Sequence, residues 1–447
     1  MKLTKETIVS LIDHKDYRRL QSLLARENEA DIAEVTDELN SERAITTFRL
    51  LPKDRAAEVF AILSPEHRQS IINSITDKEL QGILNDMFID DAVDVIEELP
   101  AGIVRRVLEN TDPQTRRLIN RFLKYPEDSA GSIMTAEYIG LKKHMTVSNC
   151  FDYIRAHAIT SETIYTCYVT NDTRQIEGVV TIKDLFLADD DAVIADIMDT
   201  NVITAHTHDD REAVVDMLNK YDFLSLPVVD NEDRLVGIIT IDDALDVMEQ
   251  EATEDFEKMA AMAPSERPYL RTNAFALAKN RILWLAVLMF ADMIAGIILH
   301  RYEEAFQAIP LLVSFIPMLI DTGGNAGSQS ATMIIRGMAV GEITLKDFFR
   351  VVFKEFQVGL LTGSVLVLIN YIRLSIMYPG KTMIILTIIL SIYIIVILSK
   401  MLGAVLPMIA KACHVDPAIM AAPMIATIVD GLGLLLYFEL ATFLLHL

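Results

Sequence analysis

The chain has 447 residues, 51% of them hydrophobic, yet its formal net charge is −23. From residue 271 onward 12 Lys and Arg stand against 10 Asp and Glu, a net of +2, so residues 1–270 hold −23 − 2 = −25. Such dense acidic charge excludes nucleic-acid binding, which needs a basic surface. It attracts divalent cations, although a surface that only confers solubility would look the same. The three cysteines form no C-x-x-C pair, which argues against disulfides and zinc.

Residues 1–129 are expected to form an all-α superhelical domain. The runs DDAVDVIEEL and AAEVFAIL place apolar residues three and four positions apart, the pattern of an amphipathic helix. Leu-Pro pairs at 51–52 and 99–100 lie 48 residues apart, as do Pro65 and Pro113. Because proline fits the first turn of a helix, each repeat predicts a helix pair that stacks on the next. The start of the chain lacks the apolar core of a signal peptide, so this domain is expected in the cytosol.

Residues 130–250 change to a β-rich pattern that occurs twice. GVVTIKDLF (178–186) and GIITIDDAL (237–245) predict the same strand, turn and helix, 59 residues apart. An Ile-Met pair precedes each copy, at 133–134 and 197–198. This arrangement resembles a tandem pair of CBS domains. The resemblance implies an α/β regulatory module of a kind that often binds adenine nucleotides.

A charged stretch at 251–280 is expected to form a connecting, plug-like helix, and residues 281–447 an α-helical transmembrane domain. Crossing a hydrocarbon core of about 30 Å takes roughly 20 helical residues. An odd number of spans after a cytosolic N-terminus places the C-terminus outside the plasma (bacterial inner) membrane, and the basic loop residues agree with this orientation. The five expected spans are 282–299, 306–335, 352–377, 383–410 and 418–445.

The second span carries a polar stripe within an apolar segment. Pro317, Asp321, Asn325 and Gln329 recur every four residues, so they share one face of a helix. Glycines beside them allow a second helix or a hydrated ion to approach the backbone. The same pattern would also suit a seam of small residues in which the amides bond between helices.

The fifth span contains a carboxylate in apolar surroundings. Asp430 shares a helix face with Pro423 and Thr427. An intramembrane carboxylate costs several kcal/mol unless it meets water, a partner or a cation, so Asp430 is a functional candidate. Its alternative is a protonated or internally hydrogen-bonded structural residue. Asp292 and Glu439 lack comparable polar neighbours, and structural or interfacial roles are expected for them.

These residues make the chain resemble the MgtE family of magnesium channels. The motif P-x-x-x-D-x-G-G-N-A-G-x-Q (317–329), the motif D-P-A…P-x-x-x-T-x-x-D (416–430) and the order of the domains carry the resemblance. It implies a homodimer whose pore runs along the subunit interface, lined by the second and fifth spans. Asp430 matches the central pore carboxylate of the family, and Asn325 belongs to the glycine-rich signature near it.

Two positions depart from the family pattern. Asp321 stands where some relatives have glycine, which adds charge to the pathway, and Ala422 stands where some have asparagine, which removes a polar contact. The remaining chemistry suits magnesium, which takes oxygen ligands, keeps several of its waters and meets only one or two carboxylates. No thiolate or histidine lines these spans, which disfavours zinc and copper, whereas manganese and cobalt stay open as alternative cargo.

The acidic clusters outside the spans are candidates for regulation. The family resemblance implies that magnesium bridges the helical domain to the CBS pair, and the connecting helix to the pore mouth. We hypothesise that these surfaces repel one another without the ion and open the pore, and that cytosolic magnesium favours the closed state. Any single carboxylate could instead be solvated or attracted by a helix dipole. The candidate regulatory residues are Asp90, Asp91, Asp94, Glu212, Asp222, Asp242, Asp243, Asp246, Glu251, Glu254, Asp255 and Asp416.

A nucleotide site in the CBS pair is a further candidate. By the CBS resemblance, the turn Thr181-x-x-Asp184 would hold a ribose of ATP through its carboxylate, with Lys183 near a phosphate and Phe223 stacked on the base. Thr-x-x-Asp is also an ordinary helix-capping sequence, so the turn has a structural alternative.

Other functional classes fit less well. Asp321 and Asp430 could be an intramembrane aspartyl protease pair. That family places Gly-x-Gly directly before its second aspartate, however, and here Ile428 and Val429 precede Asp430. An anion transporter would want cationic or amide-rich spans. The sequence therefore predicts no enzyme, but a homodimeric magnesium pore that cytosolic magnesium closes.

Overall fold

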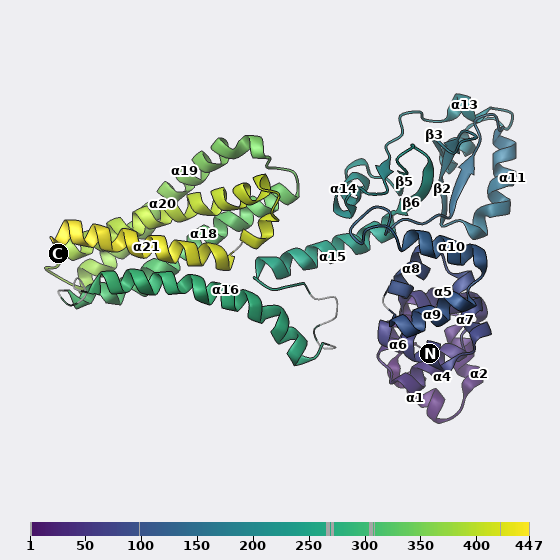
Figure 1. The fold of residues 1–447 in the computed structure, drawn as a ribbon, viewed down its shortest axis with the longest axis horizontal. Coiled ribbons are helices and arrows are strands. Elements are labelled where there is room, and N and C mark those ends of the chain that lie inside the picture. Colours follow the sequence, from purple (N-terminus) through teal and green to yellow (C-terminus); the bar gives the residue numbers. More distant parts are fainter. Residues whose placement is uncertain are drawn as a thin grey trace. The chain divides into compact units, whose positions relative to one another are not determined.

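The computed structural model describes residues 2–97, 99–264, 269, 272–303, 307, 309–420 and 422–446. The chain divides into two compact units, Met1–Met248 and Glu249–Leu447 (Figure 1). The first unit contains the short helices and both β-rich repeats. The second contains the long apolar helices.

The described part of residues 2–122 folds into short helices only. Thr76 closes a capping box at the start of one of them, because its hydroxyl accepts from Glu79 N while the Glu79 carboxylate accepts from Thr76 N. Pro65 and Pro113 stand in the first turn of their helices, so the predicted repeat of helix pairs is confirmed. The helices are α1 (Lys5–Asp13), α2 (Tyr17–Leu24), α3 (Glu29–Asp37), α4 (Ser41–Arg49), α5 (Lys53–Ile62), α6 (Pro65–Ser74), α7 (Asp77–Asp86), α8 (Ile89–Glu97), α9 (Ala101–Asn110) and α10 (Pro113–Phe122).

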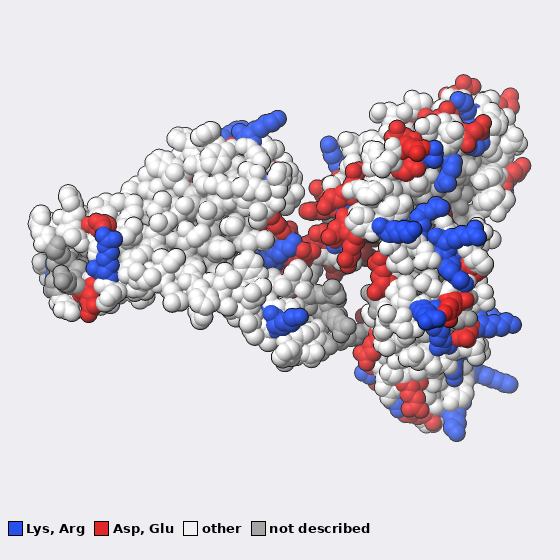
Figure 2. Space-filling model, viewed as in Figure 1, with Lys and Arg blue, Asp and Glu red and all other residues white. Residues whose placement is uncertain are grey.

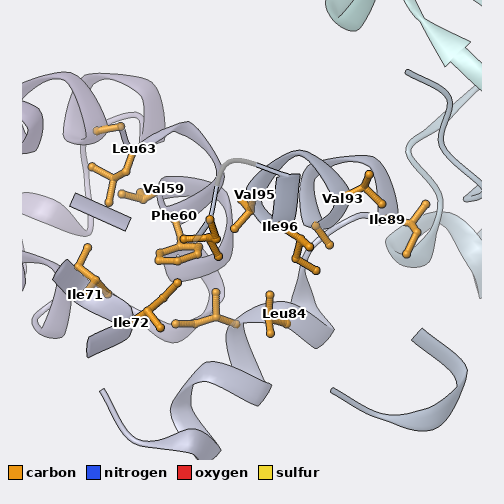
Figure 3. Close-up of a cluster of buried hydrophobic side chains, with 14 of the residues drawn as sticks. Val59, Phe60, Leu63, Ile71, Ile72, Leu84, Ile89, Val93, Val95 and Ile96 are labelled. Atoms are coloured by element: carbon orange, nitrogen blue, oxygen red, sulfur yellow. The ribbon is translucent and has the colours of Figure 1, made fainter. Parts of the chain in front are cut away.

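A continuous apolar core lies between these helices. Val59 of α5 and Ile71 of α6 are fully buried, with the ring of Phe60 beside them (Figure 3). Their counterparts 48 residues later, Val107 and Ile119, are also fully buried. Each such side chain contributes roughly 1.5–3 kcal/mol through burial. The repeated pattern of apolar residues therefore reflects a repeated packing position.

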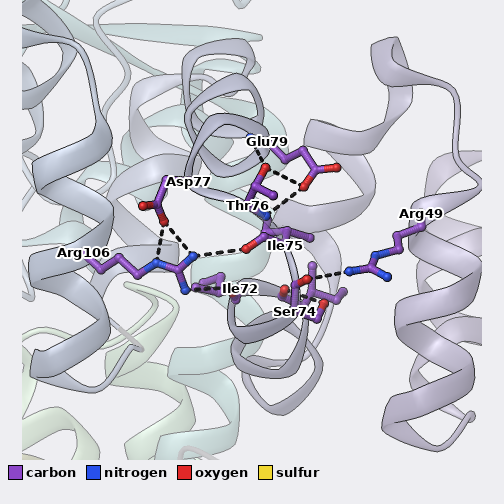
Figure 4. Close-up of polar contacts among 9 residues, drawn as sticks. Arg49, Ile72, Ser74, Ile75, Thr76, Asp77, Glu79 and Arg106 are labelled. Atoms are coloured by element: carbon purple, nitrogen blue, oxygen red, sulfur yellow. Dashed lines mark hydrogen bonds and ion pairs between the residues drawn. The ribbon is translucent and has the colours of Figure 1, made fainter.

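One arginine joins successive repeats. Arg106 of α9 donates from Nε to Asp77 Oδ1 at 2.8 Å, and from its two Nη atoms to the carbonyl oxygens of Ile72 and Ile75 at 3.0 and 3.1 Å (Figure 4). The last carbonyl groups of a helix have no partner within it, so this guanidinium satisfies the end of α6. The stacking of the helix pairs thus has a polar as well as an apolar component.

We expect the stability of this helical region to fall as the pH rises above 6.5, through the pair of His67 and Asp37. The hydrogen bond to Asp37, 2.9 Å from His67 Nδ1, raises the pKa of His67 above 6.5, although burial opposes it. Burial would raise the pKa of Asp37, but hydrogen bonds from His67 and Ser64 outweigh it and hold this pKa below 3.8.

A histidine whose pKa is raised by folding stabilises the folded state fully at pH values below its unfolded pKa. That stabilisation is lost as the pH rises through its folded pKa. An aspartate whose pKa is lowered by folding stabilises the folded state at pH values above its unfolded pKa. That stabilisation is lost as the pH falls through its folded pKa. The pair should therefore stabilise most between about pH 4 and 6.5, near the two unfolded pKa values. Hydrogen exchange of α4 and α6 in the full chain measures this, with His67→Gln as the variant. A His67→Gln effect that is as large at pH 8 as at pH 6 would contradict the assignment.

The β-rich region consists of two small sheets of the same topology. In each, the first two strands are parallel and the last two are antiparallel, in the orders β1-β2-β3 and β4-β5-β6. The predicted doubling of strand, turn and helix is confirmed. The elements are β1 (Tyr138–Leu141), α11 (Val147–His157), β2 (Thr163–Thr170), β3 (Ile176–Thr181), α12 (Ile182–Leu187), α13 (Ile194–Ile197), β4 (Ala205–His206), α14 (Arg211–Tyr221), β5 (Ser225–Val229), β6 (Leu235–Thr240) and α15 (Ile241–Met259).

The two repeats contact each other through Met134 and Met198. A Cβ at Gly237 of β6 would lie 2.8 Å from Met134 Sδ and 2.6 Å from the carbonyl oxygen of Thr135. A Cβ at Gly178 of β3 would lie 2.7 Å from Met198 Sδ. The Ile-Met pair before each repeat thus packs on the other repeat, which requires glycine at the contact.

Gly237→Ala is therefore expected to destabilise this region by about 1–3 kcal/mol, because the added methyl group meets a backbone oxygen that cannot move freely. Gly82→Ala is the matched control: Gly82 lies within α7, and a Cβ there meets nothing within 4 Å. The control should be neutral or stabilising by up to ~1 kcal/mol, since alanine favours a helix. Hydrogen exchange of β6 and α7 in the full chain measures both changes. Equal effects of the two variants would contradict the packing argument.

The long helices of the second unit differ from the predicted spans in one respect. By length and composition, four segments of the described chain can cross a membrane: Ala274–Arg301, Leu345–Met377, Thr382–Ala412 and Ala422–Leu445. The predicted second span, 306–335, is absent from these four and contains a 3-10 turn followed by a helix of 24 residues. That helix is long enough to cross a membrane, but its polar stripe and glycines make it less apolar than the other four. By length and composition, the described chain therefore has four of the five predicted spans.

The connecting helix also has different limits from those predicted. It is α15, which begins directly after β6 and ends at Met259, so it starts before residue 251. Residues 265–268, 270–271, 306, 308 and 421 of the predicted segments lie outside the described residues. The remaining elements are α16 (Ala274–Arg301), η3 (Pro310–Phe315), α18 (Ile316–Ala339), η4 (Leu345–Asp347), α19 (Phe348–Met377), α20 (Thr382–Ala412), η5 (Pro417–Met420) and α21 (Ala422–Leu445).

Candidate functional site

Glycines let α18 pack directly on α20 and α21. A Cβ at Gly323 would lie 2.8 Å from Val429 Cγ1, and one at Gly327 would lie 2.7 Å from Ile425 Cγ2. A Cβ at Gly403 of α20 would overlap the carbonyl oxygen of Gly327. Close approach of the backbones therefore depends on these glycines, as in other membrane helix pairs. The glycines of the second predicted span form a packing seam.

The polar stripe of α18 lies on another face. Asp321, Asn325 and Gln329 are exposed in the single chain. Asp430 of α21 is half-buried, and the charges of Asp292 on α16 and of Asp321 both act on it. Three helices thus bring carboxylates toward one place. Such a convergence of oxygen ligands can attract a hydrated divalent cation.

The two carboxylates expected to be structural behave differently. Glu439 accepts a hydrogen bond from the Tyr302 hydroxyl at 2.5 Å, which agrees with a structural role. Asp292 is exposed on α16 and its charge acts on Asp430, so its structural or interfacial role stays a prediction. Sequence spacing gave no signal for this, because α16 lies more than a hundred residues before α21.

A second group of carboxylates gathers in the first unit. Asp90 of α8 is only 8% exposed, and burial with the charges of Asp243, Asp91 and Glu162 raises its pKa well above 3.8. Burial, with neighbouring carboxylates, raises the pKa of Glu162 to about 8 and that of Asp243 to about 6. Glu162 Oε2 is buried and has no hydrogen-bond partner in the described part of the chain. Burial raises the pKa of Asp91, and the charge of Arg68 opposes this rise. Carboxylates that are buried and repel one another fit a cation.

The group is not a preformed coordination shell. The described residues contain no set of three Asp, Glu, His or Cys side chains close enough to hold a metal ion directly. Asp94, Asp242 and Asp246 are exposed, and Figure 2 shows acidic side chains concentrated around α14 and the first turns of α15. Such an arrangement suits an ion that keeps its waters and is held through them.

Two further candidates lie apart from these residues. Glu212 stands in the first turn of α14, and Asp222 follows its last residue in the left-handed conformation, with φ 53°. Both are exposed, and neither is among the main charges that act on Asp90 or Asp243. The structure therefore does not bring them into the acidic group.

In the second unit a lysine joins the connecting helix α15 to Asp416, the residue directly before η5. Lys258 Nζ lies 2.8 Å from Asp416 Oδ2 and 2.5 Å from Glu254 Oε1. Burial raises the pKa of Asp255, and the charge of Asp416 raises it further, while Lys258 opposes both. Glu251 is half-buried on the same helix. The predicted cluster thus contains its own cation, which carboxylate spacing alone did not reveal.

The candidate nucleotide residues have structural partners. Asp184 closes a capping box with Thr181, whose N donates to Asp184 Oδ2 at 3.0 Å. Lys183 is exposed beside it, whereas Phe223 packs on the apolar core and stacks on Tyr221 with 5.5 Å between ring centroids. The capping role of the turn is present, and the nucleotide role of Lys183, which is exposed, stays a prediction.

The two equivalent turns carry opposite charges. Thr181-Ile182-Lys183-Asp184 recurs as Thr240-Ile241-Asp242-Asp243, where the Thr240 hydroxyl donates to Asp243. The first repeat therefore presents a lysine where the second presents an aspartate. A phosphate suits the first turn and a cation suits the second.

Comparisons with known proteins agree with this architecture. Residues 316–440 match the model of a divalent cation transporter family, MgtE, and residues 27–128 match the MgtE intracellular N domain. Residues 130–191 and 194–250 each match the CBS domain. The order of these matches is the order predicted from the sequence.

Whole-length relatives are magnesium transporters by name. The chain is 37% identical over 436 residues to magnesium transporter MgtE of Thermus thermophilus, covering 96% of each chain. It is 31% identical to magnesium transporter MgtE of Bacillus subtilis, covering 98% of this chain and 97% of that one. A crystal structure of the cytosolic domain of the Mg2+ channel MgtE in complex with ATP matches 54% of this chain and 99% of its own, with 36% identity and a TM-score of 0.52.

The fold and the matched families define a membrane transport protein with an intracellular N domain and a CBS pair. Identity at this level over nearly the full length decides the family. The chain belongs to the MgtE family of magnesium transporters. The function of that family is transport rather than catalysis, so the protease alternative is excluded.

Proposed function

We propose that this chain conducts Mg2+ across the plasma membrane through a pore formed by two copies of itself. The observation that carries the proposal is the exposed stripe of Asp321, Asn325 and Gln329 on α18, a helix among membrane-crossing helices. Polar side chains facing lipid cost several kcal/mol, so this face is expected to meet water or a second subunit. Asp430, with Asp292 and Asp321 acting on it, would supply the central charge of the pathway.

The ligand set suits a hydrated cation. Two Asp430 carboxylates related by the two-fold axis of a dimer, with the Asn325 amides near them, offer oxygen atoms to an ion that keeps most of its waters. Weak outer-sphere contacts of this kind let the ion leave as well as enter. Manganese and cobalt form the same oxygen contacts and are the alternative cargo.

Cytosolic Mg2+ is proposed to close the pore through the carboxylates of the first unit. Asp90, Asp91, Asp243 and Glu162 repel one another and are poorly solvated, so a divalent cation between them would stabilise the arrangement that brings them together. Asp94, Asp242 and Asp246 would add outer contacts. Glu212 and Asp222 stay candidates for a separate, weaker site on α14.

The end of α15 is proposed to transmit this closure. Glu251, Glu254 and Asp255 lie on the helix that follows β6 directly, and Lys258 joins it to Asp416 at the start of η5. A shift in α15 would therefore act on the segment that leads into α21, which carries Asp430. Mg2+ between Asp255 and Asp416 would relieve the repulsion that raises the pKa of Asp255.

We further propose that ATP binds the cleft of the CBS pair, with Lys183 and Asp184 of the first repeat as contacts and Phe223 of the second near the base. The ATP complex of the related cytosolic domain supports this. The ribose would have to share Asp184 with its capping partner Thr181. Unchanged ATP affinity in an Asp184→Ala protein would reject the assignment.

Transport by the purified chain in liposomes tests the central proposal. We expect entry of Mg2+ down its gradient, reported by an enclosed Mg2+ indicator, and inhibition when Mg2+ bathes the side that carries the first unit. Cross-linking in the same vesicles should give a dimer, and a C-terminal tag should be accessible only from the opposite side. Entry of Mn2+ or Co2+ but not Mg2+ would select the alternative cargo, and entry of no divalent cation would reject the proposal.

A further inference from the structure

A lysine is buried among the membrane helices. Lys400 lies within α20, a helix of 31 residues, and is 5% exposed. Its Nζ donates to the carbonyl oxygen of Ala326 on α18 at 3.5 Å. Charged side chains within membrane segments are costly, face the interior of the bundle and mark functional pathways. Neither the polar stripe nor the acidic clusters account for this residue.

Close packing of α20 on α18 directs the lysine inward. The neighbouring Ser399 has its Oγ 3.3 Å from where a Cβ of Gly323 would stand, and Gly403 approaches the backbone of Gly327 directly. Lys400 lies between these two contacts in sequence, so its side chain enters the helix interface instead of the lipid. The position is thus built by the packing seam and is not a surface lysine folded inward.

A carboxylate reaches the same turn of α18 from a third helix. Glu355 of α19 accepts a hydrogen bond from the Ser330 hydroxyl at 2.5 Å. That hydroxyl also lies 3.4 Å from the Ala326 carbonyl oxygen, to which Lys400 donates. A cation and an anion therefore meet at the turn Ala326–Ser330, with Ser330 between them. A hydrogen-bonded connection of this kind fixes both charges where neither could stand alone.

A neighbouring face of the same stretch of α18 carries the proposed pathway. Asn325, directly before the turn, and Gln329, within it, belong to the exposed stripe of α18. An α-helix with its side chains is roughly 10 Å across, so charges that contact this turn lie within about one helix diameter of an ion on the stripe. At that separation in a membrane interior, Coulomb energies are still large compared with thermal energy.

We propose that Lys400 and Glu355 are positioning residues of opposite charge that set how strongly the pathway holds Mg2+. This inference rests on the proposed pore along α18. The ammonium lowers the affinity of the path for a divalent cation, and the carboxylate restores it. Their balance keeps binding weak enough for the ion to leave. Neither group touches the ion; both act through the Ala326–Ser330 turn.

The test is the concentration dependence of Mg2+ uptake by the full chain in liposomes. Glu355→Gln keeps an acceptor for Ser330 but leaves the lysine unbalanced, so its apparent KM should rise by roughly tenfold. Lys400→Met should lower the apparent KM, and the double variant Lys400→Met/Glu355→Gln should return it to within about threefold of the unsubstituted chain. Lys400→Arg keeps the charge and should keep the KM. Ser364→Ala is the control, because within the described chain the Ser364 hydroxyl donates to the Leu360 carbonyl oxygen of its own helix, α19.

A purely structural role would lower the maximum rate of both single variants and would lower that of the double variant further, without opposite shifts in KM. That outcome, or an unshifted KM in Glu355→Gln, overturns the inference. If Lys400→Met fails to assemble, Glu355→Gln and the double variant decide it, since rescue in the double variant cannot come from packing alone. Asp430→Asn, measured alongside, separates the two ideas: full uptake in that variant refutes the pore itself, whereas lost uptake with unshifted KM values refutes only the role of Lys400 and Glu355.

Discussion

Asp430→Asn is expected to reduce Mg2+ uptake by at least about 100-fold. The substitution keeps the size and a hydrogen-bonding oxygen but removes the charge, and in a dimer it removes two charges at once. Two unit charges 4 Å apart interact by about 4 kcal/mol at an effective dielectric of 20, and the ion is divalent, so even partial loss exceeds the ~2.7 kcal/mol of a 100-fold change. The initial rate of uptake into liposomes measures the effect.

Matched carboxylates on the same helices make the result specific. Glu439→Gln, also on α21, should leave uptake within about twofold, because glutamine still accepts from the Tyr302 hydroxyl. Asp292→Asn and Asp321→Asn should weaken uptake by roughly three- to thirtyfold, since their charges act on Asp430 from other helices. Equal losses in Glu439→Gln and Asp430→Asn would indicate general damage to the bundle, and unimpaired uptake in Asp430→Asn would move the pathway elsewhere.

The parts of this fold that the sequence predicts are those with a local period. In the helix pairs, the doubled β-rich unit and the long apolar segments, the spacing of apolar residues shows the element within a short stretch of sequence. That periodicity reflects burial, as the equivalent positions Val59 and Val107 illustrate. Among the long helices of the described chain, α18 is less apolar than the four candidate spans, because its polar stripe and glycines stand in place of apolar residues.

The parts that the sequence does not predict depend on contacts between distant segments. Glu162 stands in a loop without a motif, and only the fold brings it to Asp90 and Asp243. In the sequence, Lys258 is one more charged residue of the connecting helix. Its ion pair with Asp416 appears only in the folded chain. Lys400 lies within the predicted span 383–410, and only tertiary packing places it against the Ala326 carbonyl oxygen of α18. In each case the contact joins residues that are far apart in the sequence.

Neutralising Asp90, Asp91, Asp94, Asp243 and Asp246 together, each to its amide, is expected to leave the pore open at Mg2+ concentrations that close the unsubstituted chain. The reason is differential binding: a ligand shifts a conformational equilibrium only by its difference in affinity between the two states. Removing the charges removes that difference. Current recordings with Mg2+ on the side of the first unit measure closure, and the concentration for half-closure should rise by more than about tenfold.

The control carries the same number of substitutions at acidic residues away from the group. Asp152, Asp172, Asp189, Asp190 and Asp191 serve, and changing them together should leave closure as it is. Closure that is unchanged in the first variant would contradict the regulatory assignment. Closure that is lost equally in the control variant would also contradict it and would leave net charge as the explanation.

The same group predicts a pH dependence of closure with a definite sign. Carboxylates bind a metal in their deprotonated form, so protons compete with Mg2+. With pKa values of about 8 for Glu162 and about 6 for Asp243, more protons occupy the group at pH 6 than at pH 8. Half-closure should therefore need more Mg2+ at pH 6, and Glu162→Gln should flatten this dependence. If the Mg2+ concentration for half-closure is the same at both pH values, Mg2+ closes the pore by binding outside this buried group. The junction of Lys258 on α15 with Asp416 would then be the next candidate site.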